Sequence, residues 1–397
     1  MTMQDGHSAQ ARDLLPLKYH RDLVEYLKQS EPHVWEWASS TSAASQQSDD
    51  VRDAMLRQTY RLEPDSHPAV FAACAAAMEK LGIEAPVTIY QAADGTMNAA
   101  LYYVPGEIHL MFSGPTLERL GEAELLALMG HELAHYKLWS CDDNAYFNAS
   151  RILEMALSSP AATPSHRETA RLLSLNTELY ADRGAALVAG DVAPAVAMLV
   201  MVMTGLRSVD PAAYLRQAAE LEASNIKSSG HSHPESHLRA RALELWWRAS
   251  EQLENWIDRH LFGPISIESL DLLGQDRLTK LTREFLSGFV AQIEAPSEEV
   301  LTQIHRYFPN LAPGEDALDL NQIAHTRIDD PTRDYFISLM FDCALSDPES
   351  CDYVMTLAAR TAGEIGAADQ LKTALKRDLK WTKKATDSLF ARAVKAA

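Results

Sequence analysis

The residues His131-Glu132-Leu133-Ala134-His135 have the types and the spacing that metal-dependent hydrolysis needs. Residues four apart lie on one face of a helix, so the two imidazoles can bind the same metal ion. Glu132 follows the first imidazole and can act as general base on a metal-bound water. The alternative is a helix with two solvated histidines. The segment is rich in leucine, however, and buried histidines beside a buried glutamate need a partner, which a metal ion supplies.

A catalytic zinc ion takes a third protein ligand and keeps an open position for water. Glu178 lies 43 residues after His135 in a second helical segment, far enough for the chain to return antiparallel. Asp182, one turn further on the same face, can accept the ring N–H of a ligand histidine and so determine its tautomer. Taken alone, Glu178 is better explained as an exposed helix glutamate. Together with the pentad it is the preferred third ligand, for one zinc ion per chain.

The composition excludes several other classes of protein. With 397 residues, 47% hydrophobic and 23% charged, the chain is typical of a globular protein. Its formal net charge of −19 makes nucleic acid an unexpected partner. The four cysteines have no short repeated spacing, which argues against a disulfide framework and a thiolate zinc site. We expect no transmembrane segment and, because the first residues lack the apolar region of a signal peptide, a cytoplasmic location.

The elements that must position these residues are mostly helical. Short strands are expected at residues 86–90, 98–104 and 107–112, and helices at 116–138 and 166–189. We expect an α+β, predominantly α-helical fold, in which a small antiparallel sheet accompanies the active-site helices.

Further stretches make the chain recognisable. They are Asn98-Ala99, the acidic residues Glu122 and Glu124 before the pentad, the helix from Glu178 to Arg183, and Ser232-His233-Pro234 with Arg239 after it. Together these motifs resemble the zinc metallopeptidase family of the HtpX-type proteases and the CAAX prenyl proteases, within the gluzincins. The resemblance covers residues 98–243. It implies His131, His135 and Glu178 as zinc ligands, Glu132 as the base and Asp182 as the carboxylate behind a ligand histidine.

The resemblance also implies roles for residues outside the metal group. His233 would either donate to the tetrahedral oxyanion or cap the metal in the idle enzyme, although His231 and His237 lie in the same polar loop. Arg239 would anchor this loop to the active-site helices. Tyr180 is a second candidate for the oxyanion. Strand 107–112 would pair with an extended substrate through main-chain bonds, and we expect Asn98, Ala99 and His109 to contact that substrate.

Three parts of the chain are expected: an N-terminal helical segment at 1–62, a zinc metallopeptidase domain at 63–262 and a helical C-terminal domain at 263–397. Two amphipathic helices within 334–367 are loosely similar to tellurite-resistance TerB-like domains, and a plain helical cap is the alternative. Residues 371–397 carry eight basic residues against two aspartates, a charge that suits an acidic partner, an anionic membrane surface or a solvated helix face.

Two functions are therefore considered. The first is a zinc-dependent endopeptidase that hydrolyses peptide bonds in a protein or peptide substrate. Membrane members of the family carry transmembrane helices that this sequence lacks, so lipid-embedded or prenylated substrates are not implied. The second is a latent or regulatory zinc-binding protein on a metallopeptidase scaffold, whose C-terminal helical region binds a protein partner.

Overall fold

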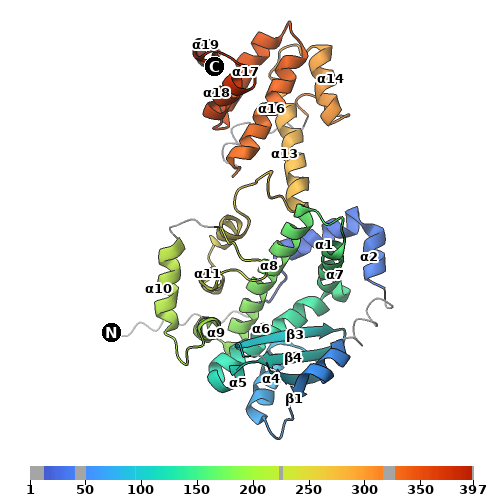
Figure 1. Cartoon of the computed structure of the whole chain (residues 1–397), viewed down its shortest axis with the longest axis vertical. Helices are drawn as coiled ribbons and strands as arrows, with labels where there is room; N and C mark the ends of the chain where they lie inside the picture. Colours follow the sequence, from blue (N-terminus) through green and yellow to red (C-terminus); the bar gives the residue numbers. More distant parts are fainter. Residues whose placement is uncertain (1–12, 41–50, 94, 223–226, 316–326, 396–397) are drawn as a thin grey trace. The chain divides into compact units, whose positions relative to one another are not determined.

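The computed structural model describes residues 13–40, 51–93, 95–222, 227–315 and 327–395. The chain divides into two compact units, Met1–Phe262 and Gly263–Ala397 (Figure 1). Helix α1 (Lys18–Ser30), which we expected in a separate N-terminal segment, packs against α7 (Ala145–Ser158) and α8 (Pro164–Ala189) of the first unit. The three-part division stays a prediction. The first twelve residues, on which the absence of a signal peptide was judged, lie outside the described residues.

The first unit contains one small sheet of four strands. Their order is β1-β2-β4-β3, with β1 at Thr59–Arg61, β2 at Val87–Ala92, β3 at Asn98–Val104 and β4 at Glu107–Ser113. The three longer strands lie where the sequence predicts them, whereas β1 falls in a region that we interpreted as helical.

The sheet is mixed, and in this respect the expectation of an antiparallel sheet is wrong. Strands β1 and β2 are antiparallel, as are β3 and β4, but β2 and β4 run parallel. A tight turn with Gly106 in the left-handed region (φ 82°) folds β3 back on β4. Because β3 takes the edge of the sheet, β4 lies between β3 and β2.

Helices make up most of the first unit, so the α+β, predominantly helical class is confirmed. Besides α1, α7 and α8 they are α2 (Pro32–Ala38), α4 (Pro68–Leu81), α5 (Thr116–Arg119), α6 (Glu122–Ser140), α9 (Val192–Thr204), α10 (Pro211–Glu222), α11 (Ser236–Trp247) and α12 (Leu253–Ile257). The single helix expected over 116–138 is broken, because Leu120 and Gly121 are extended and Gly121 begins α6 as its N-cap. Short turns of 3₁₀ and π helix follow α6 and α12, at Asp142–Asn144 and Asp258–Phe262.

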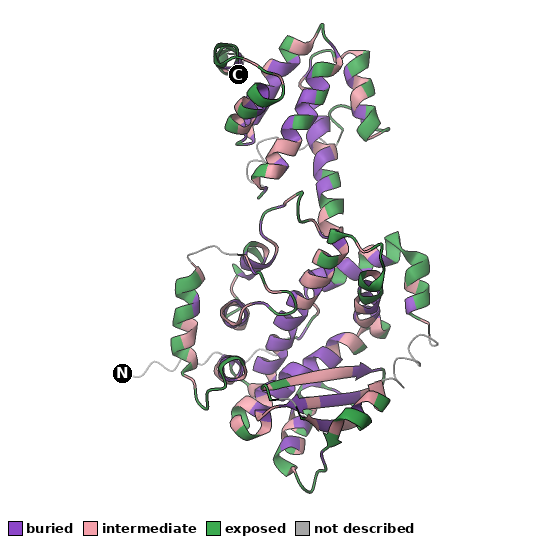
Figure 2. Cartoon of the chain, viewed as in Figure 1, coloured by how far each residue is buried: buried purple, intermediate pink, exposed green. Residues whose placement is uncertain are grey.

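Helices α6 and α8 cross at the centre of the unit, where most of their residues are buried (Figure 2). A Cβ atom on Gly184 would lie 2.4 Å from the Cβ of Ala134, and one on Gly130 would lie 2.6 Å from the Cβ of Val188. Neither distance is sterically possible without movement. Glycine at these two positions therefore permits the close approach of the two helices that carry the pentad and Glu178.

The second unit is helical in its described residues, apart from one isolated β-bridge between Ile265 and Ile328. Its helices are α13 (Leu272–Ala291), α14 (Glu298–Tyr307), α16 (Asp330–Ser346), α17 (Cys351–Glu364), α18 (Ala368–Arg377) and α19 (Lys383–Lys395). A separate apolar core, with Phe285, Phe289 and Phe336 fully buried, stabilises this unit. The similarity to TerB-like domains stays a prediction.

The basic residues near the C-terminus lie mainly on exposed faces of α18 and α19. Three of them form ion pairs with neighbouring aspartates: Lys372 with Asp369, Arg377 with Asp378, and Arg392 with Asp352. None of the helices in the described part of the chain is long and apolar enough to cross a membrane.

Candidate metal centre

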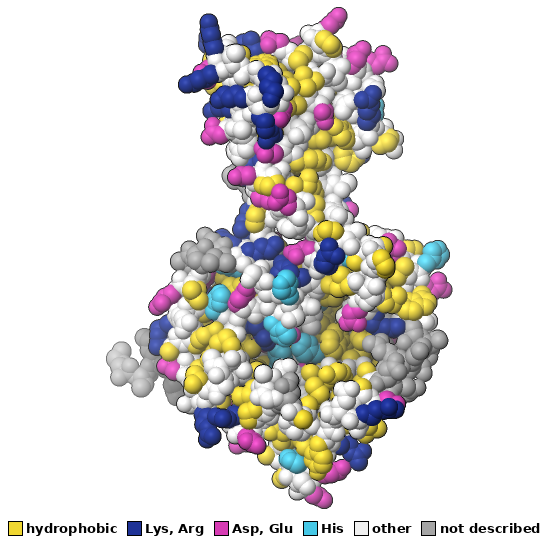
Figure 3. Space-filling model, viewed as in Figure 1, with side chains coloured by type: hydrophobic (Ala, Val, Ile, Leu, Met, Phe, Trp, Pro, Cys, Tyr) yellow, Lys and Arg dark blue, Asp and Glu magenta, His cyan; other side chains and the backbone are white. Residues whose placement is uncertain are grey.

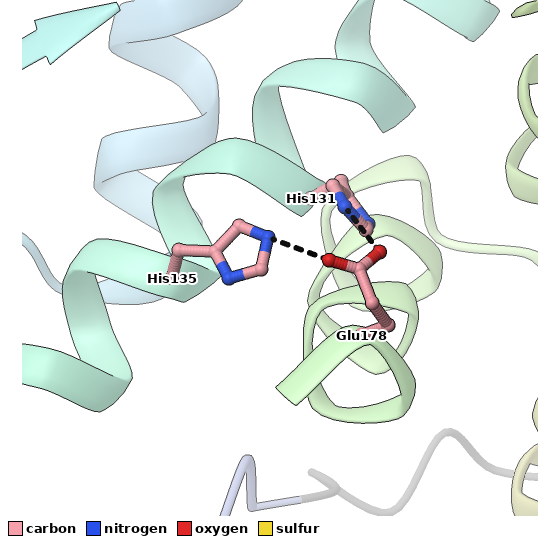
Figure 4. Close-up of side chains that lie close together, drawn as sticks. All are labelled: His131, His135 and Glu178. Atoms are coloured by element: carbon pink, nitrogen blue, oxygen red, sulfur yellow. Dashed lines mark ion pairs between the residues drawn. The ribbon is translucent and has the colours of Figure 1, made fainter. Parts of the chain in front are cut away.

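Two helices bring three metal-ligating side chains together. His131 and His135 come from α6 and Glu178 from α8, all three are buried, and their ligand atoms lie within 4.8 Å of one another (Figure 4). The Nε2 atom of His131 is 3.5 Å from Oε2 of Glu178, and Nε2 of His135 is 3.7 Å from Oε1. These separations are long for hydrogen bonds. They suit ligand atoms of one tetrahedral zinc ion. Two such atoms lie about 3.4 Å apart when each metal–ligand bond is about 2.0–2.1 Å long.

Asp182 and Arg239 support this group from behind. Oδ1 of Asp182 lies 3.2 Å from Nδ1 of His131, which leaves Nε2 facing Glu178. Arg239, from α11, donates from Nε and Nη2 to the two carboxylate oxygens of Asp182, at 2.9 and 2.7 Å. Its Nη2 also lies 3.0 Å from Oε2 of Glu178. Arg239 therefore orients both carboxylates directly, which is more than the anchoring of a loop that the sequence suggests.

The second histidine is held differently. The Nδ1 atom of His135 is buried and has no hydrogen-bond partner among the described residues. Its ring instead stacks on Trp139, one turn further along α6, with 5.4 Å between the ring centroids. Packing on Trp139 thus limits the rotation of the His135 ring. The carboxylate of Asp182 has the same effect on the His131 ring.

The charges in this group perturb one another strongly. Burial raises the pKa of Glu132 to about 7, against the attraction of His131 and Arg239. Burial also lowers the pKa of His135 to about 4. For Glu178 burial acts in the opposite direction, but the Arg239 guanidinium and the two histidines outweigh it and hold the pKa of this carboxyl well below its usual range. At neutral pH Glu178 therefore offers an ionised carboxylate and His135 a neutral imidazole, the forms that bind a metal ion. Against the effect of burial, Asp182 and Glu178 raise the pKa of His131 to about 10, so this imidazole must lose a proton when a metal ion binds.

A cavity of about 630 Å³ opens on the metal group. The three ligands and Glu132 lie on its wall, beside the first residues of β3, among them Asn98 and Ala99. Figure 3 shows histidine side chains gathered in a hollow of the first unit with hydrophobic side chains beside them. The backbone N–H of Leu101 hydrogen-bonds Glu132, so the outer side of β3 faces the candidate base.

The expectation that strand 107–112 pairs with substrate is wrong. This strand is β4, whose two sides are already paired with β2 and β3. The side chain of His109 is buried, where it contacts the hydroxyl of Tyr90 at 3.2 Å and Oε2 of Glu107 at 3.3 Å. His109 does not line the cavity. The sequence of a strand carries no information about which strand lies at the edge of the sheet.

Of the three histidines that the sequence placed in one polar loop, His237 lies in α11 and only His233 lines the cavity among the described residues. Its Nε2 atom lies 3.4 Å from Oε1 of Glu178, its Nδ1 atom is 2.8 Å from Oγ of Ser232, and its side chain is 59% exposed. His231 and His237 do not line the cavity. Tyr180, the other candidate for the oxyanion, faces away: its hydroxyl donates to the backbone carbonyl of Leu14 at 3.4 Å.

The sequence analysis missed His20, one of the residues that line the cavity. His20, on α1, is completely buried and accepts a hydrogen bond at Nδ1 from the backbone N–H of Leu17. Its Nε2 therefore carries the proton and donates to Oγ1 of Thr177, the neighbour of Glu178, at 3.2 Å. No motif marks His20. Gly130 and Gly184, by contrast, can be noticed in the sequence. Glycine inside a helix costs about 1 kcal/mol of stability, so its presence there indicates close packing against another element.

The comparisons with known proteins give limited but consistent support. No family model matches the chain, and no solved structure matches it. A curated protein from Arabidopsis thaliana, plastoglobule-localized metallopeptidase 48, chloroplastic, is 32% identical over 196 residues. The match covers 44% of this chain and 56% of the relative, so the chain spans about half the length of the curated protein it matches. The relative and the His-His-Glu group together support a metallopeptidase as the class of protein, with a bound metal ion.

Proposed function

We propose that this chain is a zinc-dependent endopeptidase, similar to the HtpX-type and CAAX prenyl proteases and with a gluzincin ligand set. The observation that carries the proposal is the convergence of His131, His135 and Glu178 on one point of a cavity wall that also holds Glu132. Histidine and carboxylate ligands in this ratio suit catalytic zinc. The cytoplasmic location expected from the sequence stays a prediction.

The residues around the metal position divide the work of hydrolysis. Zinc, when bound, polarises the scissile carbonyl and favours deprotonation of the attacking water. Glu132 takes that proton on its carboxylate and returns it to the nitrogen of the leaving amine. His233, at the open side of the cavity, is placed to donate from Nε2 to the oxyanion. Arg239 and Asp182 hold Glu178 and His131 in their orientations throughout.

The proposed substrate is an extended segment of a protein or peptide. Strand β3 lies at the edge of the described sheet, and residues 98–101 line the cavity beside Glu132. A peptide added alongside β3 would pair with main-chain groups that no other described strand uses. This arrangement transfers to β3 the role that the sequence analysis gave to residues 107–112.

The test is metal content by mass spectrometry, paired with cleavage of casein, for the wild-type protein and Glu132→Gln. We expect one zinc ion per chain in both proteins, the same circular dichroism spectrum, and cleavage by the wild type alone. Loss of the base should reduce kcat by about 10²–10⁴-fold. A Glu132→Gln protein that cleaves casein at the wild-type rate would exclude Glu132 as the base, and a folded wild type without metal would exclude the centre itself.

One contact favours the second candidate, a latent zinc-binding protein whose C-terminal region binds a partner. His233 lies 3.4 Å from a carboxylate oxygen of Glu178, close enough for its ring to cap the metal position. The variant His233→Ala separates the two functions. If His233 donates to the oxyanion, the variant should cleave casein about 10²-fold more slowly. If His233 caps a latent centre, the variant should cleave faster than the wild type.

A further inference from the structure

The cavity continues away from the metal group between α7 and α8. On α8 its wall runs back from Glu178 to Ala170, eight residues that correspond to about 12 Å of helix. On α7 it runs from Tyr146 to Leu157, which corresponds to about 16 Å. We call this part of the cavity the α7–α8 arm. Its length exceeds what one substrate side chain fills, so more than one residue of a substrate can enter it.

Aliphatic side chains line part of the arm, and Ser150, Ser174 and Thr177 line it beside them. Leu153 and Leu157 face it from α7, and Leu173 and Ala170 face it from α8. Leu157 keeps 39% of its surface exposed although it adjoins the candidate site. An apolar side chain of a substrate would cover this surface, at about 25 cal/mol for each Å² removed from water.

One acidic side chain lies beside the leucines of the arm. Glu154 lines the arm between the two leucines of α7 and hydrogen-bonds to Ser150. Its neighbour Arg151 is directed elsewhere: it donates to the carbonyl of Ala38 at 3.0 Å and lies over the ring of Trp37. Arg151 attracts the Glu154 carboxylate at longer range, but no lysine, arginine or histidine among the described residues forms a salt bridge with it. The carboxylate is therefore available to a cation that enters the arm.

From this arrangement we infer that the α7–α8 arm selects peptide segments in which an apolar side chain stands next to a lysine or arginine, on one side of the scissile bond. The inference rests on the proposed peptidase function and adds the substrate class to it. Leu153, Leu157 and Leu173 bind the apolar side chain, and Glu154 pairs with the basic one. The exposed Glu154 carboxylate discriminates against an acidic residue at the same position, because two like charges would then be brought together.

The test uses a set of internally quenched peptides that all contain one leucine. Each peptide carries either lysine or glutamate next to this leucine, on its N-terminal side in some peptides and on its C-terminal side in the others. The wild-type protein should favour the best lysine peptide over its glutamate partner about fivefold in kcat/KM. The variant Glu154→Lys should reverse this preference through KM, with kcat unchanged, because the pair forms equally in the ground state and the transition state. The matched control Glu84→Lys changes the net charge equally at an exposed position outside the cavity, and should keep the wild-type preference.

A second pair of variants tests the apolar wall. Leu157→Gln should lower kcat/KM about tenfold for leucine peptides relative to the same peptides with alanine. Met155→Gln, at an exposed position of α7 outside the cavity, should leave that ratio as in the wild type. The inference is overturned if Glu154→Lys and Glu84→Lys give the same preference, or if Leu157→Gln and Met155→Gln give the same ratio.

Binding separates a failure of this inference from a failure of the proposed function. The Glu132→Gln protein is titrated with fluorescent forms of the same peptides, with and without the Glu154→Lys substitution. If the wild type cleaves neither peptides nor casein, the proposed function fails, while a lysine preference in affinity that Glu154→Lys reverses still supports the arm. Equal affinities for lysine and glutamate peptides refute the arm, whether or not the protein cleaves.

Discussion

The two units of this chain bury their polar side chains in opposite ways. In the first unit, histidines, carboxylates and an arginine from α6, α8 and α11 face one another around one point. In the described part of the second unit, the buried polar side chains are hydroxyls and two aspartates. The aspartates serve the backbone, since Asp271 accepts from the N–H of Gly274 and Asp347 from that of Glu349.

This contrast indicates where the chemistry lies. Removing a charged group from water costs several kcal/mol of free energy, and the attraction within a buried ion pair often does not offset this cost. A fold that keeps such a cluster sacrifices stability, which is expected where a metal ion and a substrate use the charges. The second unit, with an apolar core and capped helices, shows no comparable cost in its described residues. Four predictions test this comparison, in order of decreasing effect.

The largest effect is expected from removing two ligands. His131→Ala with His135→Ala should abolish stoichiometric zinc binding, because Glu178 alone offers one ligand. The control is His305→Ala in the second unit, where His305 hydrogen-bonds the carbonyl of Leu311. Mass spectrometry should find one zinc ion per chain in the wild type and in the control. Equal zinc content in all three proteins would place the metal elsewhere.

The next effect compares a buried with an exposed arginine. Arg239→Met leaves Asp182 and Glu178 buried without their cation and should cost about 3–5 kcal/mol of unfolding free energy. Arg392→Met removes an ion pair with Asp352 in which both side chains are largely exposed, and should cost less than about 1 kcal/mol. Urea unfolding of the two variants measures the difference. If the two variants lose the same unfolding free energy, the buried ion pairs of Arg239 contribute no more to stability than a surface ion pair.

The third effect is a dependence of stability on pH. Burial, aided by Arg183 and Arg21, lowers the pKa of His20 to about 3, whereas an unfolded chain has a value of about 6.5. Between these values the unfolded state binds a proton that the folded state does not, so stability falls as the pH decreases through this window. By pH 4.5 the loss should be on the order of 3 kcal/mol.

The variant His20→Gln should remove this part of the loss and make the dependence shallower. The measurement is the unfolding free energy of the first unit between pH 7.5 and 4.5. The protein is first stripped of metal, because the release of a metal ion at low pH would add a pH dependence of its own. His33→Gln, at an exposed position, serves as control and should keep the wild-type slope. If His20→Gln also keeps that slope, His20 is not the buried neutral group.

The smallest effect compares two glycines inside helices. Gly184→Ala places a methyl group against Ala134 at the crossing of α6 and α8 and should cost about 2 kcal/mol. Gly363→Ala in α17 meets no atom within 4 Å and should instead stabilise by about 0.5 kcal/mol, because alanine loses less backbone entropy. Thermal unfolding gives the sign of each change. A stabilising Gly184→Ala would show that the helices cross less closely than described.

The sequence by itself determined the parts of this protein that depend on local periodicity. The helical repeat places His131 and His135 on one face of α6, and it places Glu178 and Asp182 on one face of α8. Strand-like stretches between turn residues located β2, β3 and β4, whereas the three-residue β1 lies in a region that was interpreted as helical. The pairing of the pentad with Glu178 was predicted because a catalytic zinc ion needs a third ligand and a second helix supplies one, and the family resemblance implies the same ligand set.

The tertiary structure decided everything that depends on which surfaces meet. Contacts between residues far apart in sequence decide the position of β3 at the sheet edge and the burial of His109. They also direct the buried Tyr180 away from the metal group and bring His20 to it from α1. Which of these contacts form depends on how all the apolar faces of the unit pack into one core, so the arrangement is a property of the whole unit. A spacing of three or four residues describes one helix face, but it cannot specify what that face will touch.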